Sequence, residues 1–260
     1  MGDPLFSVAG QVVLVSGGSR GIGKAIAQGF AQRGAKVIVT GREQATIEAT
    51  AGELSQGAEH PVVPLVCDVA DVDAVRDLAD NVERTCGPID TLVNVAGVNR
   101  RKPAVEFSED DYDFVLDINL KGPFFLSQAV GKQMVERGQG SQLNIVSLNN
   151  WAPLRNVLPY AVSKAGLGHM TRTLAVEWGP HGVRVNALAP GFILTDLTRK
   201  LWAREDMQAW GLPNTPLRRL GQPDDMIGTA IFLSSPAAAF LTGQIIFVDG
   251  GFSAGLNWPI

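Results

Sequence analysis

Short apolar runs rich in β-branched residues recur along the chain, and longer segments with helical spacing of apolar positions separate them. Seven runs have the length and composition of buried strands: residues 12–15, 36–40, 62–67, 91–95, 143–146, 183–188 and 245–248. Strands that alternate with helices build a parallel sheet. The pattern therefore predicts one α/β domain over residues 1–260, with a seven-stranded parallel sheet flanked by helices.

The segments between these runs predict helices over residues 24–32, 43–54, 71–85, 108–134 and 224–233, and a long helix that ends near Trp178. The helix at 108–134 opens with a capping sequence at Ser108. We expect this helix to be interrupted or bent around Gly122 and Pro123, because proline and glycine disturb helical hydrogen bonding.

The first strand runs directly into a glycine-rich loop and then into a helix; the loop reads Ser16-Gly17-Gly18-Ser19-Arg20-Gly21-Ile22-Gly23. Glycines at such a turn let the backbone approach a pyrophosphate at the helix N-terminus, where free N–H groups favour anions. The pattern therefore predicts a Rossmann-type, doubly wound domain. Ligands of such sheets lie at the carboxyl ends of the strands. The residues found at those ends are Gly17, Asp68, Asn94, Ser147 and Pro190.

Tyr160 and Lys164 are four residues apart, so on a helix they share one face. A phenol titrates near about 10, and lowering that pKa by roughly three units takes about 4 kcal/mol. A cation about 4 Å away supplies roughly this much at an effective dielectric of about 20. Ser147 follows an apolar strand, where its hydroxyl can donate to a substrate carbonyl oxygen. The three residues are candidates for proton transfer.

Composition narrows the range of partners. The net charge of −4 and the pI near 5.4 provide no basic field for nucleic acid or for an anionic membrane. The first residues lack the pattern of a signal peptide, and no apolar run approaches the length of a membrane span, so we expect a cytoplasmic protein. The two cysteines and three histidines lack metal-ligand spacing, so no metal site is expected.

Five motifs now stand in order along the chain: the glycine loop, Asn94-Val95-Ala96-Gly97, Ser147, the Tyr160 and Lys164 pair, and Pro190-Gly191. With them the sequence resembles the short-chain dehydrogenase/reductase family over nearly its whole length. Two positions depart from the family pattern: Ser16 replaces a threonine and Val95 replaces an asparagine. The first change keeps the hydroxyl, and the second removes an amide that steadies the central strand in relatives.

The resemblance implies roles for individual residues. Ser147 would orient the carbonyl, Tyr160 would exchange the proton, and Lys164 would lower the tyrosine pKa and bind the nicotinamide ribose. Asn119 would be the fourth catalytic residue and hold a water in the proton relay. The cofactor would contact Gly17, Ser19, Arg20, Gly21, Ile22, Gly23, Arg42, Asp68, Val69, Asn94, Ala96, Gly97, Tyr160, Lys164, Pro190, Gly191, Ile193 and Thr195. The resemblance also implies a homotetramer, whose partner subunit could receive the apolar tail at residues 255–260.

Charge at the end of the second strand favours one cofactor. Relatives that prefer NAD carry an acid there, which binds the ribose hydroxyls and repels a 2′-phosphate. This chain has Gly41 at that position, followed by Arg42, and Arg20 lies in the glycine loop. Two guanidiniums can flank a phosphate, so NADP(H) is the predicted cofactor. Glu43 nearby keeps NAD(H) possible.

Polar residues surround the expected substrate position. Arg101 follows the glycine turn at residue 97, and Asn149, Trp151 and Arg155 follow the catalytic serine. Arginine suits a carboxylate, amides suit hydroxyls and an indole suits the face of a sugar. Residues 192–212 are predicted to be a substrate lid, whose apolar residues could equally pack against a neighbouring subunit.

Residues 101–103, 215–235 and 243–251 resemble the branch of the family that contains gluconate 5-dehydrogenases and related sugar-acid reductases. We therefore expect an NADP(H)-dependent oxidoreductase that interconverts a ketone and a secondary alcohol on a sugar acid or polyol, such as gluconate and 5-ketogluconate. Residues 221–249 also resemble 3-oxoacyl carrier-protein reductases, which is the first alternative. The second is a nucleotide-binding protein without turnover; a protein of that kind has no physical need for all four catalytic residues.

Overall fold

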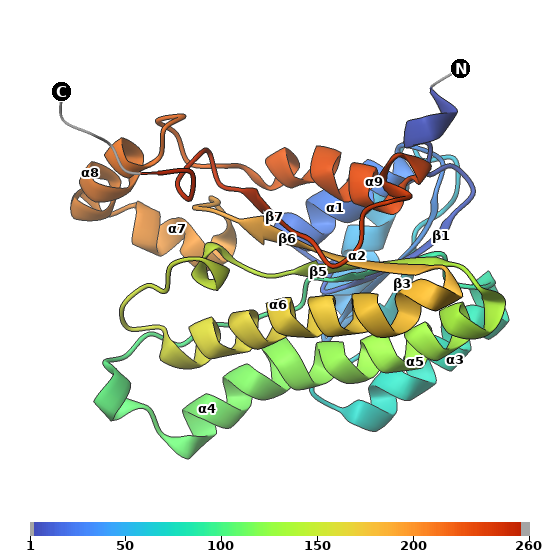
Figure 1. The fold of residues 1–260 in the computed structure, drawn as a ribbon, viewed down its shortest axis with the longest axis horizontal. Helices are drawn as coiled ribbons and strands as arrows, with labels where there is room; N and C mark the ends of the chain where they lie inside the picture. Colours follow the sequence, from blue (N-terminus) through green and yellow to red (C-terminus); the bar gives the residue numbers. More distant parts are fainter. Residues whose placement is uncertain (1–2, 256–260) are drawn as a thin grey trace.

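The computed structural model describes residues 3–255 and contains one seven-stranded parallel sheet (Figure 1). The strand order is β3-β2-β1-β4-β5-β6-β7, so the chain winds outward in both directions from β1 and β4. This confirms the predicted fold. The strands are β1 (Val12–Ser16), β2 (Lys36–Gly41), β3 (Val63–Val66), β4 (Thr91–Asn94), β5 (Gly140–Ile145), β6 (Val183–Pro190) and β7 (Ile245–Val248).

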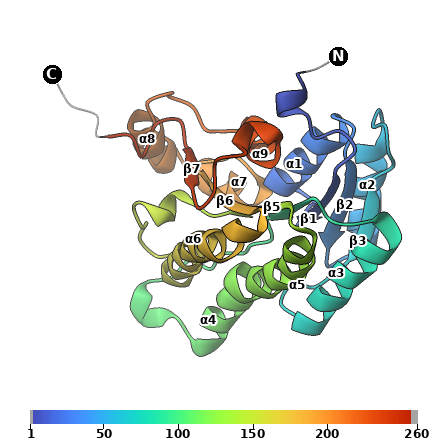
Figure 2. The same cartoon turned by 45° about the vertical axis from the view of Figure 1, so that its right-hand side comes forward.

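Helices cover both faces of the sheet, as Figure 2 shows. One face carries α1 (Gly21–Ala31), α2 (Gln44–Ser55) and α9 (Ile227–Ser234). The other carries α3 (Val72–Cys86), α4 (Glu109–Leu116), α5 (Gly122–Arg137) and α6 (Leu158–Trp178). Two further helices, α7 (Asp196–Trp202) and α8 (Glu205–Asn214), contact each other and lie at the left end of the molecule in Figure 1.

The strand β1 shows why this sequence needs two helical layers. Val13 and Val15 belong to the hydrophobic cluster under α1 and α9, whereas Val12 and Leu14 belong to the cluster under α3 and α5. All four side chains are buried. Because successive side chains point to opposite faces, an uninterrupted apolar run is stable only when both faces are covered.

Two elements differ from the sequence prediction. β5 begins three residues earlier than the apolar run, because buried Ser141 and Gln142 find carbonyl partners in Leu233 and Ser127. The disturbance of the helix at 108–134 comes just before Gly122: a π-helical segment, Asp117–Lys121, joins α4 to α5. Within residues 3–255, no helix combines the length and the hydropathy needed to cross a bilayer.

Candidate active site

The glycine loop packs backbone against backbone, which only glycine permits. A Cβ on Gly23 would lie 2.1 Å from the carbonyl oxygen of Gly17, and one on Gly17 would lie 2.6 Å from the Ala96 nitrogen. Gly17 also has φ +82°, a left-handed conformation that suits glycine. The N–H groups of Val95 and Ala96 both donate to the Ser16 carbonyl at 2.9 Å. The ends of β1 and β4 and the start of α1 are therefore held together as one rigid platform.

A cavity lies over this platform at the carboxyl ends of β1 and β2. Twelve residues predicted to bind the cofactor line it: Gly17, Ser19, Arg20, Gly21, Ile22, Gly23, Arg42, Asp68, Val69, Ala96, Gly97 and Thr195. Gly191 and Ile193 instead line the neighbouring cavity that contains Tyr160. Pro190 ends β6 and lines neither of these two cavities. The structure thus gathers most of the predicted cofactor residues into one continuous wall.

The cavity fits a nucleotide with an extra phosphate. Arg20 and Arg42 both line it near the end of β2, and Gly41 leaves open the space that an acidic side chain would fill. A Cβ on Gly41 would meet only ordinary contacts, with Ser19 and Ile47 near 3.5 Å. Two guanidiniums without an intervening carboxylate at this position match a 2′-phosphate in charge and geometry.

The Asn94 side chain does not line the cofactor cavity, although the sequence analysis named Asn94 as a cofactor contact. Its side chain is buried inside the sheet layer, where Nδ2 donates to the Ser127 hydroxyl and to Asn144 Oδ1, both at 2.9 Å. Asn144 in turn donates to the Thr171 hydroxyl on α6. The Asn94 side chain therefore joins β4 to β5 and α5, and the neighbouring residues 95–97 form the cavity wall.

Ser147 is held by the two amides that follow it. Its hydroxyl oxygen accepts from the N–H of Asn149 at 3.2 Å and from Asn149 Nδ2 at 3.0 Å. Both acceptor positions of the oxygen are thereby occupied, so its hydrogen is left to donate outward. Asn150 accepts from the Ser147 N–H and donates to the Lys164 carbonyl, which fixes the serine against α6. The pair Asn149-Asn150, which follows the serine after Leu148, is the sequence signal for this arrangement.

Tyr160 and Lys164 share one face of α6, with the lysine nitrogen 6.0 Å from the centre of the phenol ring. Lys164 Nζ donates to the Ile145 carbonyl at 2.7 Å. Burial lowers the pKa of this lysine to about 8. Burial raises the pKa of Tyr160, while a hydrogen bond from Ser147 and the charge of Arg101 act in the lowering direction. In this structure Ser147 and Arg101 therefore oppose the burial effect on the phenol, a role that the sequence analysis gave to Lys164.

Asn119 lies in the π-helical segment and is fully buried. Its Oδ1 accepts from the Val98 N–H at 2.8 Å, and its Nδ2 donates to the Val98 carbonyl and the Ser163 hydroxyl. The side chain thus joins the turn after β4 to α6. Its contact on α6, Ser163, is three residues from Tyr160. Both amide hydrogens are used, which leaves one Oδ1 lone pair for a further donor.

A cavity of about 860 Å³ opens beside Tyr160 and Ser147. Three of the four predicted substrate residues line it, namely Arg101, Asn149 and Arg155, and α7 and α8 form its opposite wall. Trp151 does not line this cavity: the indole is 52% exposed and packs edge-on against Phe252, with ring centres 6.5 Å apart. Asn149 binds the catalytic serine and Trp151 packs outside the cavity, so Arg101 and Arg155 are the two of the four predicted residues that remain available to a substrate.

Comparison with known proteins agrees with this geometry. A family model described as enoyl-(acyl carrier protein) reductase matches residues 17–253. Gluconate 5-dehydrogenase of Gluconobacter oxydans (strain 621H) is 40% identical over 253 residues, which cover 97% of this chain and 98% of that protein. D-threitol dehydrogenase of Mycolicibacterium smegmatis is 40% identical over 252 residues, covering 95% of each.

A solved structure shares the fold over the same length. It is a gluconate 5-dehydrogenase from Burkholderia cenocepacia J2315 in complex with NADP and tartrate. It superposes with a TM-score of 0.93 at 35% identity and covers 97% of this chain and 99% of its own. The glycine platform, the serine and tyrosine at one cavity, the lysine on the same face of α6 as the tyrosine, and these full-length matches lead to one conclusion: the chain belongs to the short-chain dehydrogenase/reductase family.

Proposed function

We propose that this chain is an NADP(H)-dependent oxidoreductase that interconverts a ketone and a secondary alcohol on a sugar acid, with gluconate and 5-ketogluconate as the model pair. The observation that carries the proposal is the cavity beside Tyr160, into which Arg101 and Arg155 face. Neither arginine takes part in an ion pair among residues 3–255. Two uncompensated guanidiniums favour a carboxylate. The similarity to a gluconate 5-dehydrogenase supports the same substrate class.

The chain supplies the proton and the orientation for this reaction. In the reducing direction the Ser147 hydroxyl donates to the substrate carbonyl oxygen, because Asn149 occupies its acceptor positions. Tyr160 then transfers its proton to the same oxygen; burial favours the protonated phenol, and Ser147 and Arg101 counter this burial effect and so favour release of the proton. Bound NADPH would supply the hydride. Arg20, Arg42 and the glycine platform would hold its phosphates. Lys164, whose Nζ lies beside Gly97 at the cavity wall, would bind its ribose.

The cofactor preference rests on charge. Arg20 and Arg42 attract a 2′-phosphate, whereas Glu43 lies just beyond the strand and is bonded to the Thr46 hydroxyl. We propose a clear preference for NADP(H), with NAD(H) as a slower second cofactor. A neutral polyol is the second substrate class, supported by the similarity to D-threitol dehydrogenase. Reduction of a 3-oxoacyl thioester is a third candidate, supported by the apolar Leu197, Leu201 and Met207 on the lid side of the cavity.

The test is a steady-state assay of the purified chain. Gluconate, D-glucitol and a 3-oxoacyl thioester are each supplied with both cofactors in the appropriate direction. We expect the highest kcat/KM with gluconate and NADP⁺, and loss of about 10²- to 10⁴-fold in Tyr160→Phe, which removes only the proton-carrying hydroxyl. A faster rate with the thioester, or turnover that survives in Tyr160→Phe, would overturn the proposal.

A further inference from the structure

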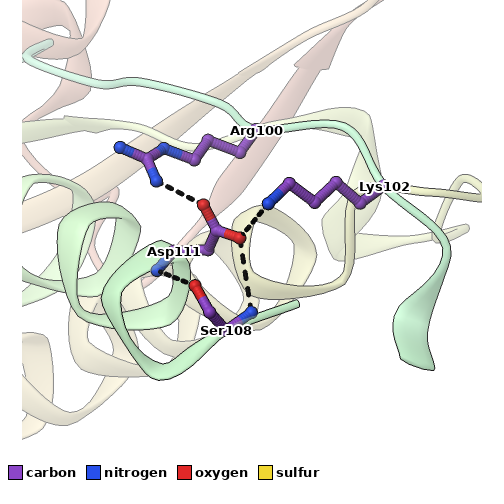
Figure 3. Close-up of polar contacts among 4 residues, drawn as sticks. All are labelled: Arg100, Lys102, Ser108 and Asp111. Atoms are coloured by element: carbon purple, nitrogen blue, oxygen red, sulfur yellow. Dashed lines mark hydrogen bonds and ion pairs between the residues drawn. The ribbon is translucent and has the colours of Figure 1, made fainter. Parts of the chain in front are cut away.

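Asp111 is a buried carboxylate near the start of α4, on which two cations converge. Figure 3 shows Arg100 and Lys102 each donating to one of its oxygens, and the Ser108 N–H donating to the oxygen that Lys102 also contacts. The Asp111 side chain is 3% exposed, whereas those of Arg100 and Lys102 are 40% and 41% exposed. A carboxylate removed from water is stable only when it is paired, so these contacts hold the loop after β4 against α4.

Each of the two cations has a second anchor. The Arg100 guanidinium lies over the Phe114 ring, 4.3 Å from its centre. The N–H of Lys102 donates to the Asn156 carbonyl at 3.1 Å, which joins this loop to the segment after Ser147. Contacts with α4 and with the facing loop therefore fix the residues on both sides of Arg101.

Arg101 differs from its two neighbours. It lines the cavity beside Tyr160, as Lys102 also does, and its charge acts to lower the pKa of that phenol against the larger, raising effect of burial. None of the ion pairs among the described residues involves it, whereas both neighbours are paired with Asp111. Of three consecutive cations, the structure thus leaves the middle one to meet an anion in the cavity.

We propose that Asp111 is a positioning residue: by binding Arg100 and Lys102 it directs Arg101 toward the substrate, and so sets a preference for a carboxylate over the neutral polyol of the same chain length. The inference deepens the proposed function and rests on it. Asp111 lies on α4 and contacts the loop after β4, and it lines neither the cofactor cavity nor the substrate cavity. It therefore acts on the substrate through the loop that it holds, in which Lys102 is paired with Asp111 and Arg101 is the cation left unpaired at the cavity.

The test compares gluconate with D-glucitol, which has the same hydroxyl configuration and carries CH₂OH in place of the carboxylate. In Asp111→Asn we expect the ratio of kcat/KM for gluconate to kcat/KM for D-glucitol to fall about tenfold, through KM for gluconate. Arg101→Met should lower the ratio at least as much. The double variant should be no worse than Arg101→Met alone, because residues that act through one another are not additive.

Two matched variants separate positioning from a general loss of structure. Asp110→Asn removes an exposed carboxylate one residue away and should leave the ratio unchanged. Ser108→Ala removes the helix cap, a hydrogen bond of 3.2 Å to the Asp111 N–H, but leaves the carboxylate and its cations in place. It should lower thermal stability without changing the ratio. An equal fall for both substrates in Asp111→Asn, or a fall of the ratio in Ser108→Ala, would overturn the inference.

A further readout needs no turnover. Tartrate binding to the NADP⁺ complex, measured by calorimetry, should weaken about tenfold in Asp111→Asn and remain unchanged in Asp110→Asn. Tighter binding in Asp111→Asn would mean that Asp111 screens the three cations rather than aiming one of them, and would overturn the inference. If the wild-type protein oxidises neither gluconate nor D-glucitol, the proposed function fails, while the tartrate comparison still decides the role of Asp111.

Discussion

At the scale of single residues, Asn149 decides what the catalytic serine can do. A serine hydroxyl can rotate freely and can accept or donate, but here Asn149 occupies both acceptor positions. Asn149 Oδ1 is itself held by the Leu154 N–H at 3.0 Å, so the amide cannot turn away. The serine is therefore oriented as a donor before the substrate arrives.

Asn149→Ala should lower kcat about tenfold, because the side-chain hydrogen bond that orients the serine contributes about 1 to 1.5 kcal/mol. KM for NADPH should not change. The measurement is steady-state reduction of 5-ketogluconate. On a Ser147→Ala background the same change should have almost no further effect, because Asn149 acts through the serine. A further tenfold loss on that background would contradict the mechanism.

Lys164 makes stability depend on pH in an unusual direction. Burial lowers its pKa from an ordinary 10.5 to about 8, so the folded protein releases this proton before the unfolded chain does. Below pH 8 the folded state carries the full cost of a buried charge. As pH rises from 8 toward 10.5 the unfolded chain binds more protons than the folded one, and the cost is relieved.

Lys164→Met should therefore be inactive, and its stability relative to the wild type should fall as pH rises. Between pH 7 and pH 9.5 the difference in free energy of unfolding should move by about 2 kcal/mol in favour of the wild type. Urea unfolding of both proteins at the two pH values measures this, and groups common to both cancel. A constant difference would show that the lysine has an ordinary pKa.

At the scale of elements, five aromatic rings connect α7 and α8 to the rest of the fold. Phe192 contacts Trp202, Trp210 and Phe252, with ring centres 4.8 to 5.6 Å apart. Phe252 also contacts Trp151. The cluster joins α7 and α8, which form the predicted lid, to the segment after β7 and to the loop after Ser147, so both helices have a defined position beside the cavity.

Phe252→Ala should loosen this lid, because it removes three edge-to-face contacts worth about 0.5 to 1.5 kcal/mol each. We expect KM for the sugar acid to rise about three- to tenfold and trypsin to cut faster between residues 199 and 204, with KM for NADPH unchanged. Phe240→Ala is the matched control, because that ring is fully exposed. Equal behaviour of the two variants would mean that the aromatic cluster does not position the lid.

At the scale of the whole molecule, apolar side chains remain exposed on the helical layer formed by α4, α5 and α6. Tyr112, Phe124, Val162 and Val176 are 43% to 78% exposed there. Apolar surface on neighbouring helices is typical of a subunit interface. The tail at residues 256–260, which the sequence analysis also assigned to a partner, lies outside the described residues.

The chain should form a homotetramer, with a mass by light scattering about four times the 27.7 kDa of one subunit. Val176→Asp should reduce this mass by placing a charge in the apolar contact. Val66→Asp at the β3 edge of the sheet is also a change of an exposed valine, and it should leave the mass unchanged. A wild-type monomer in solution would contradict the prediction.

Local patterns in the sequence were sufficient for the fold. Seven apolar runs and the segments between them predicted the seven strands and their helical layers, because burial on two faces requires that pattern at each strand separately. The glycine loop could also be predicted from the sequence, because the close approach of Gly23 to Gly17 involves residues only six positions apart.

The tertiary structure alone decided which polar residues face the substrate. Trp151 looked like a sugar platform until Phe252, a hundred residues later, was seen to hold it outside the cavity. The Asn94 side chain donates to Asn144 on the neighbouring strand and so belongs to a buried network outside the cofactor cavity. Arg100 and Arg101 are chemically identical in the sequence, and only the position of Asp111, on α4 and outside their loop, distinguishes them. Residue chemistry and periodicity are local properties, whereas the partner of a side chain depends on segments that meet only when the chain is folded.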